Sequence, residues 1–311
     1  MAPAMTAAIL VSIAMTLAAA ATPILLAALG ELVTEKAGVL NLGVEGMMLS
    51  GAVAGFAVAY STGSVPLGLV AATLAGVAAA MIFALLTLGL GSNQVATGLA
   101  LTIFGIGASS LIGAGFVGRT IARLGPLFPA DYAAHPWLRL IFGHDGVVYL
   151  SLALVGAVSL FLRRTRAGLI LRAVGENAES AHAIGYRVLA IRTAATGFGG
   201  ALAGLGGAYF SLALTPMWAD RLTAGRGWIA LALVVFAAWK PGRLLVGAYL
   251  FGAVATFELQ AKAAGWTFVA PELLAMTPYL ATTVVLTMMS LGGSTGGRDA
   301  PACLGKPFPA S

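Results

Sequence analysis

The chain has 311 residues, of which 59% are hydrophobic and only 9% are charged, and its net charge is +6. A mean hydropathy of +0.96, with apolar runs of about 20 residues recurring along the chain, excludes a soluble globular protein. The basic residues lie at the ends of the apolar runs, which favours membrane topology and contact with membrane lipid over binding of nucleic acid. We therefore expect an all-α polytopic integral membrane protein.

The first apolar run, residues 1–30, predicts a membrane helix that Pro23 kinks. The following stretch is too polar to lie across lipid unshielded, so its polar side chains should face protein or a water-filled path. We expect a broken hairpin near residues 31–46, although simple caps at a hairpin tip explain the first two glutamates as well. The polar residues are Glu31, Glu35, Lys36, Asn41 and Glu45.

The remaining apolar runs predict further spans, many with small residues at helical spacing that let backbones approach closely. About 8–10 membrane helices should form a single domain over residues 1–292, followed by a flexible tail over 293–311. The polar group around Asn93 is either a helix cap or a lining of a path, and the segment 239–243 forms either a hairpin or an interrupted helix. The expected spans are 46–61, 66–90, 94–117, 147–162, 193–214, 227–239, 244–258 and 272–291.

Residues 119–146 form a long hydrophilic interval with mixed charge, several prolines and Trp137. Such an interval suits a surface helix or lid that a soluble binding protein could contact, although interfacial anchoring explains Trp137 equally well. The spacing of His135 and His144 belongs to no zinc motif, so we expect no metal site.

Residues 163–192 gather six arginines and two glutamates between two apolar runs, which predicts a cytoplasmic loop. Inside this loop, residues 176–184 read as a short amphipathic helix. Asn177 or Gly175 can serve as its N-cap, and Gly185 should end it. A short helix on such a loop favours a docking role, although a topogenic signal with no further role is the alternative.

Three sequences in the chain carry a resemblance to a known family. GENAESAHAIG, residues 175–185, followed by a helix rich in small residues, resembles the coupling loop of permease subunits of ATP-binding cassette (ABC) importers of the branched-chain amino acid and simple-sugar group. EKAGVLNLGVEGMMLSGA, residues 35–52, is similar to the signature of nucleoside-type permeases in that group. APACLGKPF, residues 300–308, resembles the ending of the same permeases.

The resemblance implies an importer permease fold in the bacterial inner or plasma membrane, crossed several times by the chain. It also implies an ABC ATPase subunit, a second permease chain that is identical or homologous, and an extracytoplasmic solute-binding protein. Asn41 and Glu45 would lie on the inner half of the translocation path, and Asn93 is a further candidate there. The ATPase would dock on the loop at Glu176, Asn177, Glu179, Ala183 and Gly185.

No glycine-rich phosphate loop is present, since Gly305 and Lys306 are followed by Pro307, so the ATPase should be a partner and this chain should need no cofactor. An enzyme would need converging acid and base groups, and a self-sufficient secondary transporter would need ionisable residues within several spans; the sequence favours neither. The apolar spans suit a neutral polar solute. Nucleosides follow from the resemblance, with simple sugars and branched-chain amino acids as alternatives.

Overall fold

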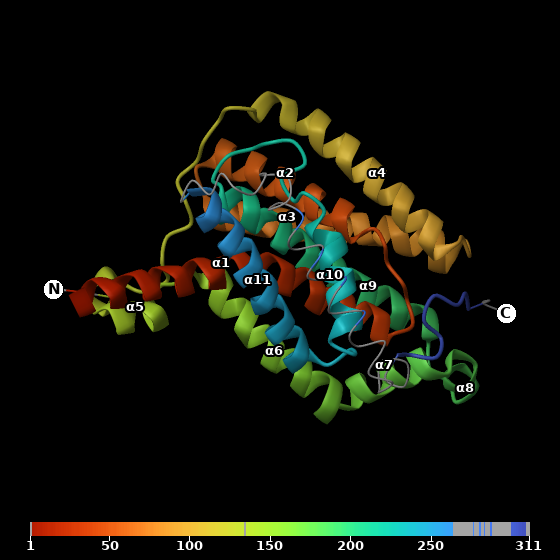
Figure 1. Cartoon of the computed structure of the whole chain (residues 1–311). Coiled ribbons are helices and arrows are strands. Elements are labelled where there is room, and N and C mark those ends of the chain that lie inside the picture. Colours follow the sequence, from red (N-terminus) through yellow and green to blue (C-terminus); the bar gives the residue numbers. More distant parts are fainter. Residues whose placement is uncertain are drawn as a thin grey trace.

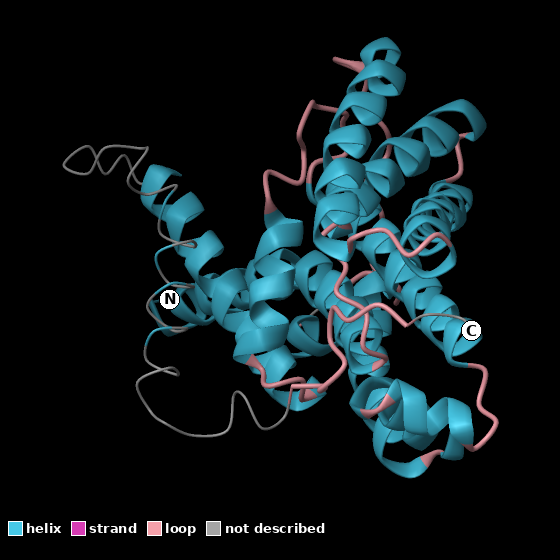
Figure 2. Ribbon diagram, turned by 90° about the vertical axis from the view of Figure 1, so that its right-hand side faces the viewer, coloured by secondary structure: helices cyan, strands magenta, loops and turns pink. Residues whose placement is uncertain are grey.

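The computed structural model describes residues 2–133, 135–263 and 300–308, with the single positions 276, 280, 283 and 287. Within these residues the chain forms helices joined by mostly short loops, with three isolated β-bridges and no β-strand (Figure 2). The protein is therefore all-α, as its composition predicts.

Six of the described helices are long and apolar enough to cross a membrane: α1, α2, α3, α4, α6 and α9. The expected number was 8–10, which also counted α10, α11 and a span at 272–291. That last span lies outside the described residues, apart from four single positions. The helices are α1 (Ala2–Lys36), α2 (Val44–Thr62), α3 (Val65–Ala84), α4 (Gln94–Gly113), α5 (Pro136–Phe142), α6 (Gly146–Arg164), α7 (Arg166–Glu176), α8 (Ala178–Ala183), α9 (Val188–Tyr209), α10 (Arg226–Phe236) and α11 (Pro241–Ala263).

Helix α9 lies at the centre of the bundle and packs against α1, α2 and α3. Its glycines allow this packing, because a Cβ atom on Gly204 would overlap the backbone of Ala72 in α3, and one on Gly207 would overlap that of Met48 in α2. Small residues at such contacts let helix backbones come within van der Waals distance in a membrane. The stripe of small residues in the sequence thus marks the axis of the fold.

The break between the first two helices is narrower than the expected range 31–46. Helix α1 continues through Pro23 to Lys36, and only residues 37–43, the α1–α2 tip, are outside helices. Glu31 and Glu35 are each 1% exposed. Because protein surrounds both carboxyl groups, their polarity does not require the helix to end.

The bundle has two ends, which Figure 1 shows on opposite sides. The α8 end carries α7, α8, the α1–α2 tip and the tail segment 300–308. The α5 end carries α5 and the N-terminal turns of α1, with which α5 is in contact. Helices α10 and α11 are separate helices joined by a turn at residues 237–240, so the segment 239–243 belongs to a hairpin rather than to one interrupted helix.

Candidate functional site

Glu45, in the first turn of α2, places a carboxylate against the N-terminus of α10. Its Oε1 atom accepts hydrogen bonds from Thr223 Oγ1 at 2.6 Å and from the Gly225 N–H at 2.8 Å, and its Oε2 atom accepts one from the Gly227 N–H at 2.7 Å. The N-terminus of a helix has free N–H groups and a partial positive charge. Glu45 is 5% exposed, so it acts as a cap contributed from another helix inside the bundle.

Helix α10 spans only part of the bundle. Its 11 residues are about 16 Å long, roughly half of a hydrocarbon core of about 30 Å. The chain turns back into this helix through Arg221, Ala224 and Gly225, whose φ values are 54°, 47° and 79°. Short or interrupted helices are a common element of transporters.

Asn41 organises the α1–α2 tip. Its Oδ1 atom accepts a hydrogen bond from the Gly43 N–H at 3.0 Å, and its own N–H donates to Glu31 Oε1 at 3.1 Å. Gln94, at the start of α4, accepts from the Leu40 N–H at 2.8 Å. These bonds stabilise the tip itself and join it to α1 and α4, whereas the N-cap residue of α2, Gly43, has no side chain to cap the helix.

Two further polar residues, Glu35 and Asn93, form hydrogen bonds at helix ends. Glu35 accepts a hydrogen bond from Trp239 Nε1 at 2.6 Å, which joins α1 to the turn between α10 and α11. Asn93 caps α4, because its Oδ1 atom accepts from the Ala96 N–H at 3.0 Å. Asn93 is exposed, whereas Glu35 is buried.

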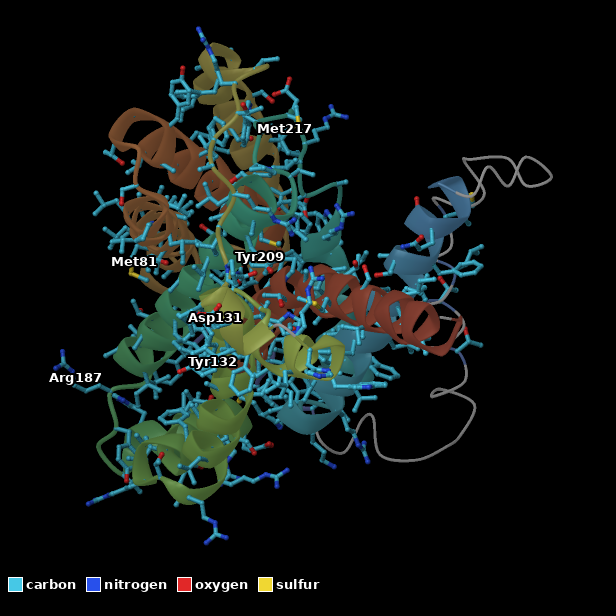
Figure 3. All side chains as sticks on the ribbon, turned by 90° about the vertical axis from the view of Figure 1, so that its left-hand side faces the viewer. Met81, Asp131, Tyr132, Arg187, Tyr209 and Met217 are labelled. Atoms are coloured by element: carbon cyan, nitrogen blue, oxygen red, sulfur yellow. The ribbon has the colours of Figure 1, made fainter. Side chains whose placement is uncertain are left out.

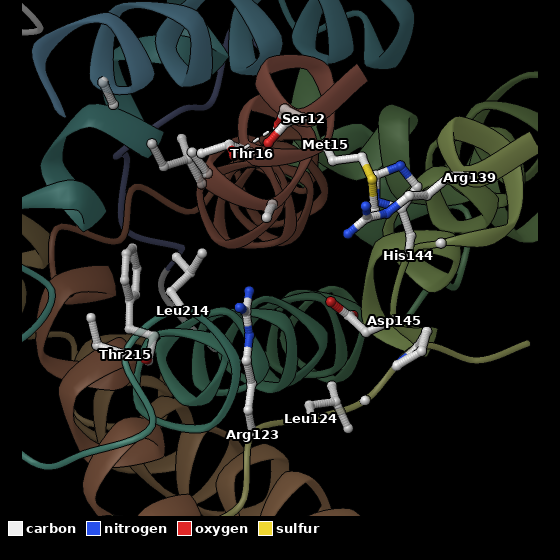
Figure 4. Close-up of a pocket in the computed structure, with 18 of the residues that line it drawn as sticks. Ser12, Met15, Thr16, Arg123, Leu124, Arg139, His144, Asp145, Leu214 and Thr215 are labelled. Atoms are coloured by element: carbon white, nitrogen blue, oxygen red, sulfur yellow. Dashed lines mark hydrogen bonds between the residues drawn. The ribbon is translucent and has the colours of Figure 1, made fainter. Parts of the chain in front are cut away.

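A cavity of about 1030 Å³ opens at the α5 end, between α1, α11, the start of α10 and the interval 119–146. Figure 4 shows Arg123 across this space from Ser12 and Thr16 of α1, with Asp145 at its side and Arg139 next to α1. The charged and ionisable residues that line it are Arg123, Arg139, His144, Asp145, Arg226 and Glu258.

Asp145, in the cavity wall, connects the start of α6 to α9. Its Oδ1 atom accepts from the Val147 N–H at 2.9 Å and thereby caps α6, while its Oδ2 atom accepts from Tyr209 Oη at 2.6 Å. Burial lowers the pKa of the neighbouring His144. The charge of Asp145 raises this pKa, but the effect of burial is larger. The imidazole is therefore neutral at neutral pH, and the wall presents both donors and acceptors to a polar solute.

This cavity was not predicted from the sequence. Asn41, Glu45 and Asn93 lie outside its lining, and the arginines at 123 and 139 had no assigned role. The interval 119–146 does contain a surface helix, α5, on which Trp137 is 61% exposed. Asp145, directly before an apolar run, was the available signal, since an acidic residue there is typical of a helix N-cap.

The α7–α8 segment, residues 166–185, forms the exposed end of the bundle opposite the cavity. Asn177 caps α8, because its Oδ1 atom accepts from the Ser180 N–H at 2.9 Å, and Gly185 ends the segment with a φ of +92°. Helix α8 is shorter than the expected 176–184: Glu176 is the last residue of α7, since the extended backbone of Asn177 (φ −148°, ψ 95°) separates the two helices.

The outer side chains of this segment project away from the bundle. Glu176, Glu179 and Ala183 are exposed, and Ile184 is 72% exposed. Figure 3 shows Arg187 pointing outward at the same end. Helix α8 thus presents a polar outer face that is followed by the exposed apolar side chain of Ile184.

The chain is similar to several known permease proteins. A putative glucose ABC transporter permease protein of Haloferax volcanii is 42% identical over 290 residues, 86% of this chain and 88% of that protein. A guanosine ABC transporter permease protein of Bacillus subtilis is 29% identical over 304 residues, 93% of each chain. A nucleoside ABC transporter permease protein of Lactococcus lactis is 27% identical over 285 residues, 86% of this chain and 88% of that protein.

The family model described as the permease component of branched-chain amino acid transport systems matches residues 13–292. With six helices of membrane-spanning length among the described residues, the chain is a multi-pass plasma membrane protein. It belongs to the family of permease components of ABC transporters of the branched-chain amino acid transport type.

Proposed function

We propose that this chain is the membrane subunit of an ATP-driven importer for nucleosides, with ATP hydrolysed by a partner subunit. The observation that supports coupling to an ATPase is the α7–α8 segment, whose short capped helix α8 is exposed at one end of the bundle. In this proposal the α8 end is cytoplasmic and receives an ABC ATPase at Glu176, Asn177, Glu179, Ala183 and Gly185. The arginines around α7 favour this orientation.

The cavity at the α5 end is then the outward-facing part of the translocation path. Its lining combines guanidinium donors with carboxylate acceptors, which suits the hydroxyl and ring groups of a neutral polar solute. Asn41, Glu45 and Asn93 remain the proposed residues of the inner half of the path. Asn41 and Glu45 would reach a solute only after their present hydrogen bonds open.

Two observations bear on the identity of the solute, and they favour different candidates. Residues 35–52 resemble the nucleoside-type signature, and two of the relatives are named for guanosine and nucleosides. The relative with 42% identity is named for glucose, which favours a sugar as the second candidate. Both kinds of solute are uncharged and carry hydroxyl groups on a ring.

The proposed assembly contains a second permease chain, identical or homologous, beside residues 1–292. An extracytoplasmic solute-binding protein would contact the α5 end, where α5 and Trp137 are exposed. The rigid helix packing would convert closure of the ATPase into rotation of the two permease halves around a central path.

Uptake by a strain that lacks this chain tests the proposal. We expect loss of high-affinity uptake of labelled guanosine, and restoration by the parent chain but not by Asn41→Ala at equal protein level. Loss of glucose uptake with normal guanosine uptake would refute the nucleoside part and leave the importer part intact. Uptake that persists in membrane vesicles depleted of ATP would refute the importer.

A further inference from the structure

The tail segment 300–308 is bound to the α8 end by backbone hydrogen bonds. The Cys303 N–H donates to the Gly175 carbonyl at 2.9 Å, and the Gly305 N–H donates to the Gly38 carbonyl at 3.2 Å. Gly175 belongs to α7 and Gly38 to the α1–α2 tip. The composition of residues 293–311 predicts a flexible tail, whereas its described part connects two segments that are far apart in the sequence.

Side chains of the tail extend this contact to α8. The Phe308 ring lies 5.5 Å from the His182 ring, measured between centroids, in an edge-to-face arrangement. Cys303 and Phe308 also pack against a small apolar cluster under α8. The buried members of that cluster are Val174, Ala178, Ala181 and Val188.

Arg192, in the second turn of α9, ties the same elements together from inside. It is 1% exposed, and its Nε atom donates to the Ala37 carbonyl at 3.2 Å while its Nη1 atom donates to the Lys306 carbonyl at 3.1 Å. Ala37 directly follows α1, where free carbonyl groups carry a partial negative charge that favours a cation. One buried guanidinium therefore links the end of α1, the start of α9 and the tail.

Helix α8 depends on these contacts for its position, because its six residues form less than two turns. A helix that short is not stable alone, so packing must fix its orientation. The inner residues Ala178 and Ala181 pack on the cluster that the tail completes, while the outer residues stay exposed. The tail and Arg192 thus form a continuous series of contacts from α8 to the α1–α2 tip.

We propose that Arg192 and the tail segment 300–308 are positioning elements that hold α8 against the α1–α2 tip, so that these parts move as one body during transport. This inference builds on the proposed function, in which an ATPase docks on α8. It extends that function by assigning the tail and a buried arginine to the coupling step. Neither touches the solute.

The test uses the complete complex in lipid vesicles and measures solute molecules transported per ATP hydrolysed, with labelled guanosine and labelled glucose as probes. Phe308→Ala removes the ring from α8, and Arg192→Lys keeps the charge but shortens the bridge between two carbonyl groups. We expect each to lower the transport ratio about tenfold, at unchanged permease level and unchanged co-purification of the ATPase. Phe308→Tyr keeps the ring and should retain the ratio.

Lys306→Gln is the matched control, because Arg192 binds the Lys306 backbone carbonyl while the Lys306 side chain is exposed. An unchanged ratio in Phe308→Ala would overturn the inference. So would loss of the permease from the membrane or of the bound ATPase in both Phe308→Ala and Arg192→Lys, since that result assigns the tail to folding or docking. Parent vesicles that transport without ATP would instead refute the proposed function, a separate outcome.

Discussion

Glu45 carries a carboxylate into the apolar interior, and its surroundings explain how the fold tolerates it. Removing a charge from water costs several kcal/mol unless hydrogen bonds and opposite charge compensate. Here two N–H groups at the start of α10 and the Thr223 hydroxyl donate to the carboxylate. A residue that looked suited to line a path is thereby also a structural link between α2 and α10.

Glu45→Gln should destabilise the protein by about 2 kcal/mol, because an amide NH₂ group would replace one acceptor and face a backbone donor without a partner. Thermal unfolding of the purified protein in detergent measures this change. Asp220→Asn is the control, since Asp220 is exposed and lies on the same returning loop. Equal melting temperatures for Glu45→Gln and the control would contradict the capping role.

His144 makes stability depend on pH. Burial lowers its pKa in the folded protein, so below pH about 6.5 the unfolded chain binds a proton that the folded chain does not. The stability that the neutral imidazole contributes is present above this pH and is lost as the pH falls through the lowered pKa. Thermal unfolding between pH 7 and 5 should show a steeper loss in the parent than in His144→Gln, and parallel curves would disprove this assignment.

At the scale of elements, the packing of α9 against α2 and α3 depends on glycines at the helix contacts. A Cβ atom on Gly207 would overlap the Met48 carbonyl, so Gly207→Ala must push α2 away from α9 and should cost about 3 kcal/mol. Gly107→Ala is the matched control, because Gly107 lies in α4 with open space around it. A denaturation midpoint for Gly207→Ala equal to that of Gly107→Ala would show that α2 and α9 are not closely packed.

The end of the α7–α8 segment depends on backbone conformation. Gly185 has a φ of +92°, which a β-branched residue adopts only with strain of about 1–3 kcal/mol. Gly185→Val should therefore distort α8 while the membrane helices form normally. Uptake assays and immunoblots of membranes should show low transport at a normal permease level, and normal transport in this variant would argue against coupling through α8.

At the scale of the whole molecule, the orientation in the membrane can be tested with the single cysteine. Cys303 lies at the α8 end, where its N–H binds the Gly175 carbonyl, so it shares the side of the membrane on which α8 lies. In intact cells Cys303 should resist a membrane-impermeant maleimide and should react after the membrane is opened. Labelling of intact cells would reverse the proposed topology.

The sequence predicted what depends on local patterns. Apolar runs located the helices, and Asn177 and Gly185 were identified because caps are set by neighbouring residues. The partner of Glu45 could not be predicted, since Thr223 lies 178 positions away and the contact exists only after folding. The bound tail was missed for the same reason, because composition reports the tendency of a segment to be flexible but not the surface that holds it.

The length of α1 determines which part of this helix lines the cavity. Its 35 residues extend about 52 Å, well beyond a hydrocarbon core of about 30 Å. The part of α1 that is apolar enough to cross a membrane runs from Ile9 to Lys36, so Thr16 and Ser12, both in the cavity wall, lie on this part of the helix. A polar molecule in the cavity therefore meets two hydroxyl groups on a membrane-crossing helix rather than a wholly apolar wall.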